Sequence, residues 1–170
     1  MGWFERTFPN DTPIELWPHV MERLRGTPVR IEEKVRGLDP AVARQRRGED
    51  WSIQEHIGHL LDFEEPDGLH SMRIDDFERG AEVLTAADVT NQRTWDAGHH
   101  EAELDDLLKR FRAARTRLLA RLDAMSDEMR ARVGLHPRLK TEMRLIDMLV
   151  FWAEHDDHHL AKMHDLIQSG

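Results

Sequence analysis

Residues 145–167 have the sequence LIDMLVFWAEHDDHHLAKMHDLI, in which apolar side chains recur every three or four positions. This spacing is typical of a helix that packs one face against a core. The predicted face consists of Leu145, Met148, Trp152, His155, His159, Met163 and Leu166. Imidazoles occupy two of these positions, where a helical bundle normally buries hydrocarbon. The segment therefore predicts a buried helix that carries a polar site.

His155 and His159 are four residues apart, so on a helix they share one face about one turn apart. Two neutral imidazoles at this spacing can chelate a divalent metal ion with little rearrangement. The alternative is a pair of core histidines that bond to carbonyls or carboxylates. A buried polar ring needs a partner, and one metal ion would satisfy both rings. We therefore favour a metal site.

The first helix is expected to follow the Thr-Pro pair at 12–13, which matches an N-cap with proline at the first helical position. It continues to about Leu24, and Pro18 either bends it or marks its true start. The Gly-Thr-Pro sequence at 26–28 is expected to interrupt it. A short second piece then ends near Gly37.

The second helix begins with a predicted capping box, in which Ser52 is the N-cap and Glu55 follows three residues later. If this helix continues to about Phe77, Pro66 must kink or break it, because proline removes a backbone donor and clashes with the preceding turn.

Polar residues 80–100 form a long connection, which is a candidate lid or partner-binding segment. A third helix is predicted over residues 104–125, and a loop over residues 134–140 leads to a last helix capped by Thr141. The predicted fold is all-α, an antiparallel four-helix bundle formed by a single domain over residues 1–170.

Composition excludes several classes of protein. The chain has 170 residues, a formal net charge of -9 and no cysteine. The acidic balance argues against a nucleic-acid partner, and the lack of thiols leaves only nitrogen and oxygen to bind a metal. No apolar run approaches the length of a membrane span, and no secretory signal is visible at the start. We expect a cytoplasmic protein with no membrane partner.

A metal held by two histidines usually needs a third ligand, and the second predicted helix offers His56 and His59. His56 lies nearer the edge of the apolar stripe, whereas His59 lies farther around the helix. Gly58 would let a neighbouring helix approach closely, which favours a site there. The pattern alone does not decide between the two histidines.

Residues 51–60, WSIQEHIGHL, followed by Glu64, resemble the second-helix signature of the DinB-like superfamily. Residues 154–160, EHDDHHL, are similar to its fourth-helix signature, and residues 24–28, LRGTP, extend the resemblance over most of the chain. This superfamily also contains the metal-dependent hydrolases of the YfiT type, the bacillithiol transferases and the mycothiol-dependent maleylpyruvate isomerase.

The resemblance implies a four-helix bundle, often dimeric, with a divalent metal ion held by three histidines between the second and fourth helices. Residue by residue, it places the ligands on His59, His155 and His159. His56 is then expected to face outward or a groove. Four further residues are candidates to hold the ligands in place or to lie beside them: Asp62, Glu64, Asp156 and His158.

Three nitrogen ligands leave metal positions open for water or substrate, as in a catalytic site. Zinc is the first choice of metal, and nickel, iron and manganese are alternatives. The resemblance implies a metal-dependent thiol transferase or hydrolase that acts on a small molecule, with a low-molecular-weight thiol as an expected partner. No catalytic side chain is assigned. The alternative is a non-catalytic, stress-related metal-binding homodimer.

Two further expectations concern the surface. His99 and His100 could cover the metal cleft, but histidines on the surface at a helix start are the commoner case. A homodimer is also suggested by aromatic side chains that look exposed in the sequence, although those at the N-terminus could fold back onto their own bundle. They are Trp3, Phe4, Phe8, Trp17 and Trp95.

Overall fold

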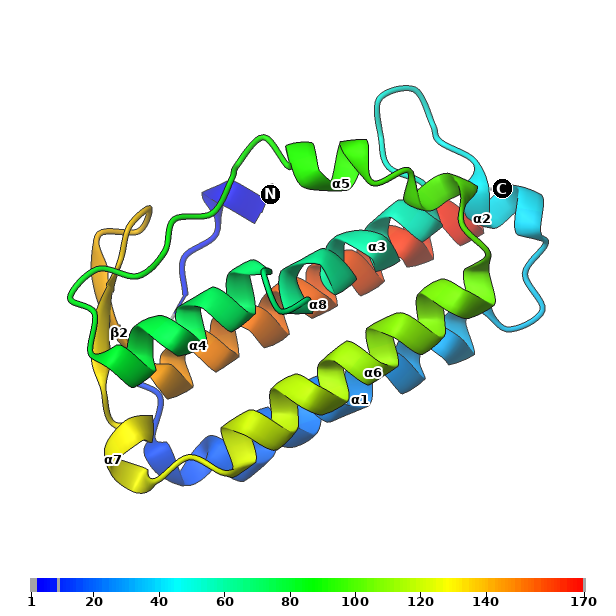
Figure 1. The fold of residues 1–170 in the computed structure, drawn as a ribbon. Helices are drawn as coiled ribbons and strands as arrows, with labels where there is room; N and C mark the ends of the chain where they lie inside the picture. Colours follow the sequence, from blue (N-terminus) through cyan, green and yellow to red (C-terminus); the bar gives the residue numbers. More distant parts are fainter. Residues whose placement is uncertain (1–2, 9, 170) are drawn as a thin grey trace.

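A computed structural model describes residues 3–8 and 10–169 of the chain. Its main elements are four helices, α1 (Trp17–Val35), α3 (Ile53–Glu64), α6 (Leu104–Asp123) and α8 (Leu145–Gln168), which form a bundle (Figure 1). The predicted all-α four-helix bundle is confirmed. Within the part described, no helix combines the length and the apolar character needed to cross a membrane.

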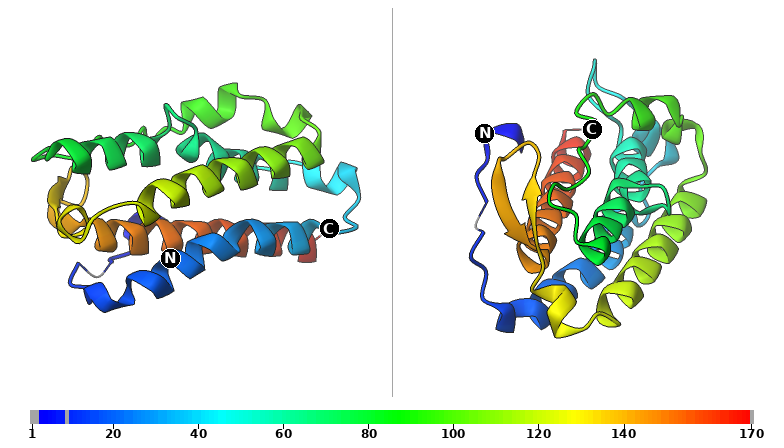
Figure 2. Two further views of the ribbon diagram at one scale, coloured as in Figure 1. Left: turned by 60° about the horizontal axis from the view of Figure 1, so that its bottom comes forward. Right: turned by 60° about the vertical axis from the view of Figure 1, so that its left-hand side comes forward.

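The helices are not packed in chain order. α1 and α3 each pack mainly against α6 and α8, so α1 lies diagonally opposite α3, and α6 lies diagonally opposite α8. α1 and α8 run in one direction, and α3 and α6 run in the other (Figures 1 and 2). This arrangement needs a long return between α3 and α6. The chain provides it by α4 (Leu69–Arg79) and the connection over residues 80–103.

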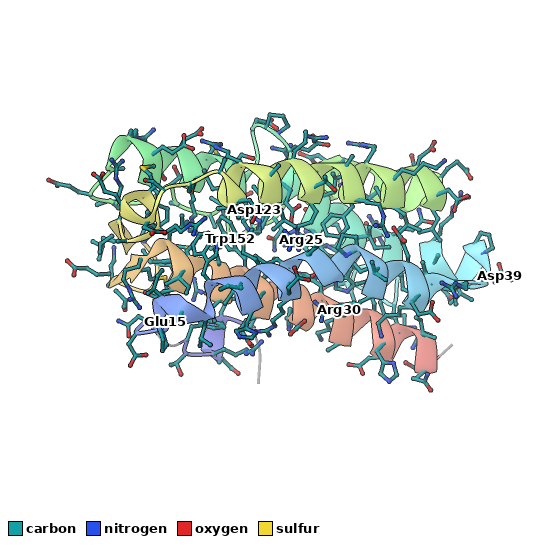
Figure 3. The ribbon with its side chains drawn as sticks, turned by 90° about the horizontal axis from the view of Figure 1, so that it is seen from below. Glu15, Arg25, Arg30, Asp39, Asp123 and Trp152 are labelled. Atoms are coloured by element: carbon teal, nitrogen blue, oxygen red, sulfur yellow. The ribbon has the colours of Figure 1, made fainter. Side chains whose placement is uncertain are left out.

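Two buried apolar clusters hold the bundle together. One surrounds Trp152 and Leu24, and the other surrounds Ile57 and Phe111. Figure 3 shows Trp152 among the helices, and Arg25 and Asp123 where α1 and α6 lie side by side. The Arg25 Nη2 to Asp123 Oδ2 distance is 3.0 Å, but both side chains are exposed. The pair therefore contributes little compared with the apolar clusters.

The first helix differs from the prediction, because α1 continues through Pro28 without a break. Proline has no N–H, so the carbonyl of Leu24, four residues earlier, loses its helical donor. The Arg115 guanidinium supplies the missing bond, with Nη1 2.6 Å from the Leu24 oxygen. Of the two alternatives for Pro18, the structure shows the second, in which Pro18 marks the true start. Pro18 lies in the first turn of α1, and residues 12–13 precede a short 3-10 turn, η2 (Ile14–Leu16).

The predicted break at Pro66 is confirmed, because α3 ends at Glu64 and α4 begins at Leu69. The chain turns sharply at Gly68, where an added Cβ would lie 2.4 Å from the carbonyl oxygen of Asp62. The turn therefore requires glycine.

The predicted loop before the last helix is wrong in part. Residues 133–144 form an antiparallel hairpin of β1 (Val133–His136) and β2 (Thr141–Arg144). Thr141 pairs within this hairpin and does not cap α8. Arg144 is the N-cap residue instead, and its backbone N–H donates to the Asp147 carboxylate at 3.1 Å. The hairpin is extended by the long connection, because Leu84 N–H donates to the Leu135 carbonyl over 3.0 Å. Pairing of Thr141 with His136 in the hairpin therefore outweighed the local cap signal.

Shorter helices complete the described part of the chain, namely η1 (Trp3–Glu5), α2 (Pro40–Arg44), α5 (Gln92–Asp96), η3 (His99–Glu101) and α7 (Asp127–Arg130).

The aromatic side chains expected to lie exposed do so only in part. Trp17 is buried, and Trp3 and Phe8 fold back onto Phe151 of α8. Phe4 and Trp95 remain exposed. The chain covers most of this aromatic surface itself, and the homodimer stays a prediction.

Candidate metal centre

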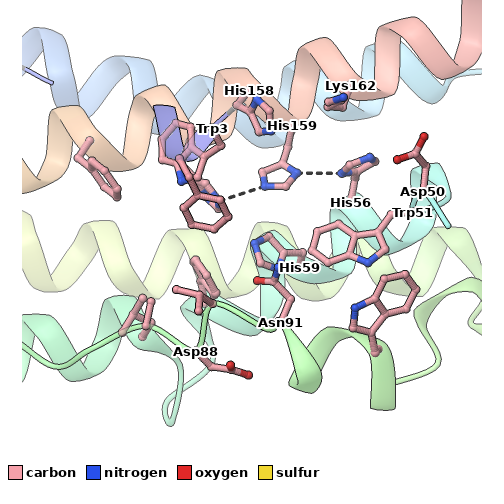
Figure 4. Close-up of a pocket in the computed structure, with 18 of the residues that line it drawn as sticks. Trp3, Asp50, Trp51, His56, His59, Asp88, Asn91, His158, His159 and Lys162 are labelled. Carbon is pink, nitrogen blue, oxygen red and sulfur yellow. Dashed lines mark hydrogen bonds between the residues drawn. The ribbon is translucent and has the colours of Figure 1, made fainter. Parts of the chain in front are cut away.

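Three histidines from two helices converge inside the bundle. His59 of α3 meets His155 and His159 of α8, and one ring nitrogen from each lies within 4.8 Å of the others. The two Nε2 atoms of His155 and His159 are 3.0 Å apart (Figure 4). All three side chains are buried. The structure thus brings together the three residues that the family resemblance selects.

The start of α3 is fixed by the predicted capping box, which sets the direction in which His59 points. Ser52 Oγ accepts from Glu55 N–H at 3.2 Å, and the Glu55 carboxylate accepts from Ser52 N–H at 2.9 Å. Arg46 binds the same carboxylate with Nε at 2.8 Å. Because its oxygens are engaged there, Glu55 is held away from the three histidines.

The ring of His59 is oriented by a hydrogen-bonded chain from the long connection. Its Nδ1 is 3.0 Å from Oγ1 of Thr94, and that hydroxyl donates to Oδ2 of Asp62 at 3.0 Å. A hydroxyl has one proton, so His59 Nδ1–H is the donor to Thr94. The Nε2 lone pair of His59 is then free to bind a metal ion. Holding the second ring nitrogen in this way is the usual means of orienting a histidine ligand.

His99 is part of the same arrangement and is not a surface residue. Its Nε2 is 2.9 Å from Asp62 Oδ2, and the side chain is buried. Its ring lies on Gly58, where an added Cβ would be 2.1 Å from a ring carbon. The close approach predicted at Gly58 therefore comes from the 80–100 connection and not from a bundle helix. His100 lies half-buried beside Arg46.

His56 is a fourth histidine of the cluster, and of the two expected positions, outward or toward a groove, the structure shows the second. It lines the cleft, is buried, and has its Nδ1 2.9 Å from His159 Nδ1. Burial lowers the pKa of His56 to about 4, so the ring is neutral at pH 7 and its Nδ1 can accept a hydrogen bond from His159 Nδ1–H. This contact leaves Nε2 of His159 directed at His155.

The electrostatic environment favours neutral imidazoles. Burial lowers the pKa of His59 to about 3, and it holds the pKa values of His155 and His159 well below 6.5. Metal-bound nitrogens of a tetrahedral site are separated by about 3.3 Å, given metal–nitrogen bonds of about 2.0 Å. The spacing of the cluster is compatible with that value. Nδ1 of His155 is buried and has no hydrogen-bond partner within the described part of the chain. The donor set therefore fits a divalent cation.

The cluster forms part of the wall of a cleft with a volume of about 650 Å³. The wall comes from α3 and α8, and the rim from the 80–100 connection, the N-terminal turn and the hairpin turn. Trp51 lies with its ring centroid 4.7 Å from that of His59, and Trp3 lies 5.0 Å from His155 (Figure 4). A small molecule in this cleft would therefore meet the histidines between two indole rings.

The other four candidates lie in different surroundings. Asp62 bonds to Thr94 and His99, as described above. His158 is half-buried on the cleft wall, with its ring centroid 5.2 Å from that of His159.

Glu64 and Asp156 point to the opposite side of their helices, where both bind the buried guanidinium of Arg115. Thr27 also donates to Asp156, at 2.7 Å. Burial raises the pKa of Glu64 to about 7. These two carboxyls support the packing of α1 and α6 against the site helices.

Two groups that orient the histidines were missed by the sequence analysis, namely His56 as a partner of His159 and Thr94 as a partner of His59. For His56 the signal was available, because it is three residues before His59 and close to the apolar face. Thr94 carried no such signal. It is 35 residues from His59 and is positioned by the path of the long connection.

These features define a four-helix-bundle protein with a three-histidine site in the wall of a cleft. The model of the DinB superfamily matches residues 23–163, and the chain belongs to that superfamily. The family resemblance noted in the sequence is confirmed.

Two solved structures share the fold. YfiT from Bacillus subtilis, described as a probable metal-dependent hydrolase with an unusual four-helix bundle topology, is 18% identical with a TM-score of 0.75. The match covers 96% of this chain and 93% of that chain. A mycothiol-dependent maleylpyruvate isomerase is 14% identical with a TM-score of 0.69, over 93% of this chain and 63% of that chain. No curated protein sequence matches significantly.

Proposed function

We propose that the chain binds one divalent metal ion on His59, His155 and His159 and acts as a metal-dependent enzyme on a small molecule. The observation that carries the proposal is the convergence of three neutral, buried imidazoles in the wall of a large cleft. Zinc remains the first choice of metal, because three histidine ligands with an open fourth position suit it. Nickel, iron and manganese bind the same donor types.

The site is open on the cleft side. A closed structural site would need a fourth side chain, for which Glu55 and Asp62 are the nearest acids on α3. Glu55 is bound by Arg46 and the helix start, and Asp62 is bound by Thr94 and His99. With both acids engaged elsewhere, a position facing the cleft is left for water or substrate. This favours a catalytic role over purely structural metal binding.

A divalent ion with an open position can lower the pKa of bound water or activate a thiolate. The protein's own residues would then hold the reactants. Thr94 and His56 fix two of the ligand rings, and Trp51 and Trp3 form walls that exclude water. A solved relative in fold depends on mycothiol and another is a probable metal-dependent hydrolase. A thiol-dependent transfer or a hydrolysis is therefore the reaction that we propose.

The test is metal content after loading with zinc, nickel or manganese and desalting. We expect about one ion per chain, and strong loss of binding in His59→Ala, His155→Ala and His159→Ala. His164→Ala is the matched control, because His164 is exposed on the same helix as two of the ligands. A wild-type chain that retains none of these metals would contradict the proposal.

Openness is tested on the cobalt-substituted protein. Addition of a small thiol or azide should change the cobalt spectrum, since an exchangeable position faces the cleft. A spectrum that no thiol or anion alters would favour the non-catalytic alternative. The homodimer is a separate proposal, and light scattering that gives the mass of a single chain at micromolar concentration would contradict it.

A further inference from the structure

Arg73 of α4 is a buried guanidinium that no carboxylate neutralises directly. Its side chain is 1% exposed and lines the cleft. Nε donates to the Thr85 carbonyl at 3.0 Å, and Nη1 is 3.5 Å from the sulfur of Met148. Within the described residues Arg73 forms no ion pair. The nearby carboxylate of Asp76 is already bound by Thr85 N–H at 2.5 Å and by Arg79. A buried cation without a direct partner is costly unless something else binds it.

His136, in the hairpin, directs a hydrogen-bond donor at the same part of the cleft. Its Nδ1 accepts from the backbone N–H groups of Arg138 at 3.3 Å and Leu139 at 3.2 Å. Nδ1 therefore carries the lone pair, and the proton of the neutral ring is on Nε2. This Nε2 is buried without a partner among the residues described. Because His136 lines the cleft, the unpaired donor is available to a ligand.

Arg138 adds a second guanidinium from the hairpin turn. It lines the cleft, and its Nη2 is buried with no hydrogen-bond partner in the described chain. Its Cζ lies 5.3 Å from the ring centre of Phe4. The three groups line the same cleft. The charges of Arg73 and Arg138 add to the effect of burial, which lowers the pKa of His136 to about 4.

The geometry points to an anion subsite formed by Arg73, His136 and Arg138, which binds a carboxylate of the substrate. These donors suit two carboxylate oxygens, which can accept several directed bonds at once. Leu69 and Phe151 line the cleft beside them and suit an apolar body next to the carboxylate. The role as part of a substrate site rests on the proposed function, whereas anion binding itself does not.

The position of the subsite limits the size of the substrate. Met148, which contacts Arg73, precedes the ligand His155 by seven residues on α8. At the rise of an α-helix this is about 10 Å along the axis. The subsite and the histidine cluster are therefore on the order of 10 Å apart along α8, which suits a small carboxylic acid.

The test uses the full chain freed of metal by a chelator, so that no ion can bind the probe. Benzoate is titrated by calorimetry, with neutral benzamide as its isosteric control and phenyl phosphate as the phosphate source. We expect benzoate to bind and benzamide to bind at least about tenfold more weakly, because only the anion accepts charge-assisted bonds. Tighter binding of phenyl phosphate than of benzoate would overturn the carboxylate assignment.

The variants Arg73→Met and Arg138→Met should each weaken benzoate binding about tenfold or more. Arg47→Met is the matched control, because Arg47 lines the same cleft but donates to the Leu166 carbonyl at 2.9 Å. If Arg73→Met does not fold, the result for Arg138→Met tests the subsite, because Arg138 lies in the hairpin turn and its replacement should leave the fold intact. Unchanged affinity in Arg138→Met, or loss of binding only in Arg47→Met, would overturn the subsite.

His59→Ala separates this inference from the proposed function. Benzoate binding should survive in that variant even though the metal site is removed. If the wild-type chain binds no metal but benzoate still depends on Arg73, the subsite stands and the metal proposal fails. If metal binds as expected and benzoate does not bind, the metal proposal stands and the subsite fails.

Discussion

On α8, His155 and Asp156 are neighbours in sequence, yet the first faces the cleft and the second faces α1 and α6. α3 repeats the contrast with His59 and Glu64. On the inner side, Arg115 is fully buried and binds both carboxylates. On the cleft side, the buried guanidinium of Arg73 has no ion pair among the described residues, and the histidines have lone pairs to offer.

The difference separates buried charged groups that stabilise the fold from buried groups that remain available to bind a ligand. Arg115 has a raised pKa despite its burial, because Asp156 and Glu64 act on it. Arg73 has a pKa lowered to about 10, because burial outweighs the attraction of Asp76. Both residues are buried arginines, but Arg115 is paired with carboxylates, whereas Arg73 is available to a ligand. We expect changes on the inner side to reduce stability and changes on the cleft side to reduce binding.

The largest effect is expected from Arg115→Met. It leaves Glu64 and Asp156 buried without their cationic partner. It also removes the hydrogen-bond donor to the Leu24 carbonyl, which Pro28 cannot replace because it has no N–H. The free energy of unfolding should fall by about 3–5 kcal/mol, measured by chemical denaturation. Arg73→Met, the matched change on the cleft side, should cost about 1 kcal/mol. Equal losses in the two variants would contradict the contrast between the two sides.

Acidification is expected to have the next largest effect, and it acts on the cleft side of the metal-free chain. The pKa values are about 3 for His59 and about 4 for His56 in the fold, and 6.5 is the ordinary value regained on unfolding. Between these values the unfolded chain binds more protons, so stability is present above pH 6.5 and is lost as pH falls. Each such histidine should cost about 1 kcal/mol between pH 6.5 and 5.5.

Glu64 acts in the opposite direction, because its raised pKa makes the folded chain take up a proton in the same range. It is one carboxyl against the whole histidine cluster, so the net change is a loss of stability in acid. Denaturation curves at several pH values check this sign. Stability that rises as the pH falls from 6.5 to 5.5 would show that the histidines are not buried as neutral rings.

The structure of the two sides could be predicted from the sequence only where it follows from a local pattern of residues. The stripe over residues 104–123 and the four-residue spacing of His155 and His159 follow from helical geometry, and both predicted features are present. The sequence around Pro28 predicts a helix break, whereas the helix continues because Arg115 of α6 donates the hydrogen bond that Pro28 cannot give to the Leu24 carbonyl. The sequence does not indicate the hairpin before α8 for a related reason, since its strand β1 is also paired with the distant 80–100 connection. Local patterns mislead where a residue distant in sequence supplies the hydrogen bond that a backbone group needs.

A smaller effect, confined to binding, is expected from Thr94→Val. This change keeps the shape of the side chain but removes the hydroxyl that holds His59 Nδ1–H. Metal affinity should fall about 10-fold to 100-fold, as for other groups that orient ligands, while the inner side is left intact. Thr90→Val is the control, because Thr90 is exposed in the same connection. Competition with a chromogenic chelator measures the affinity, and equal values for both variants would count against the orienting role.

The smallest effect is expected at His158, which adjoins the ligand His159 in sequence and lies on the cleft wall. No hydrogen bond to the other histidines is seen for it in the part of the chain described, whereas His56 is 2.9 Å from His159. His158→Ala should therefore change metal affinity by less than about twofold. His56→Phe removes the acceptor for His159 Nδ1–H and should weaken metal binding about tenfold. The same chelator competition compares the two variants. A larger loss in His158→Ala than in His56→Phe would mean that the metal draws its ligands from a different set of histidines.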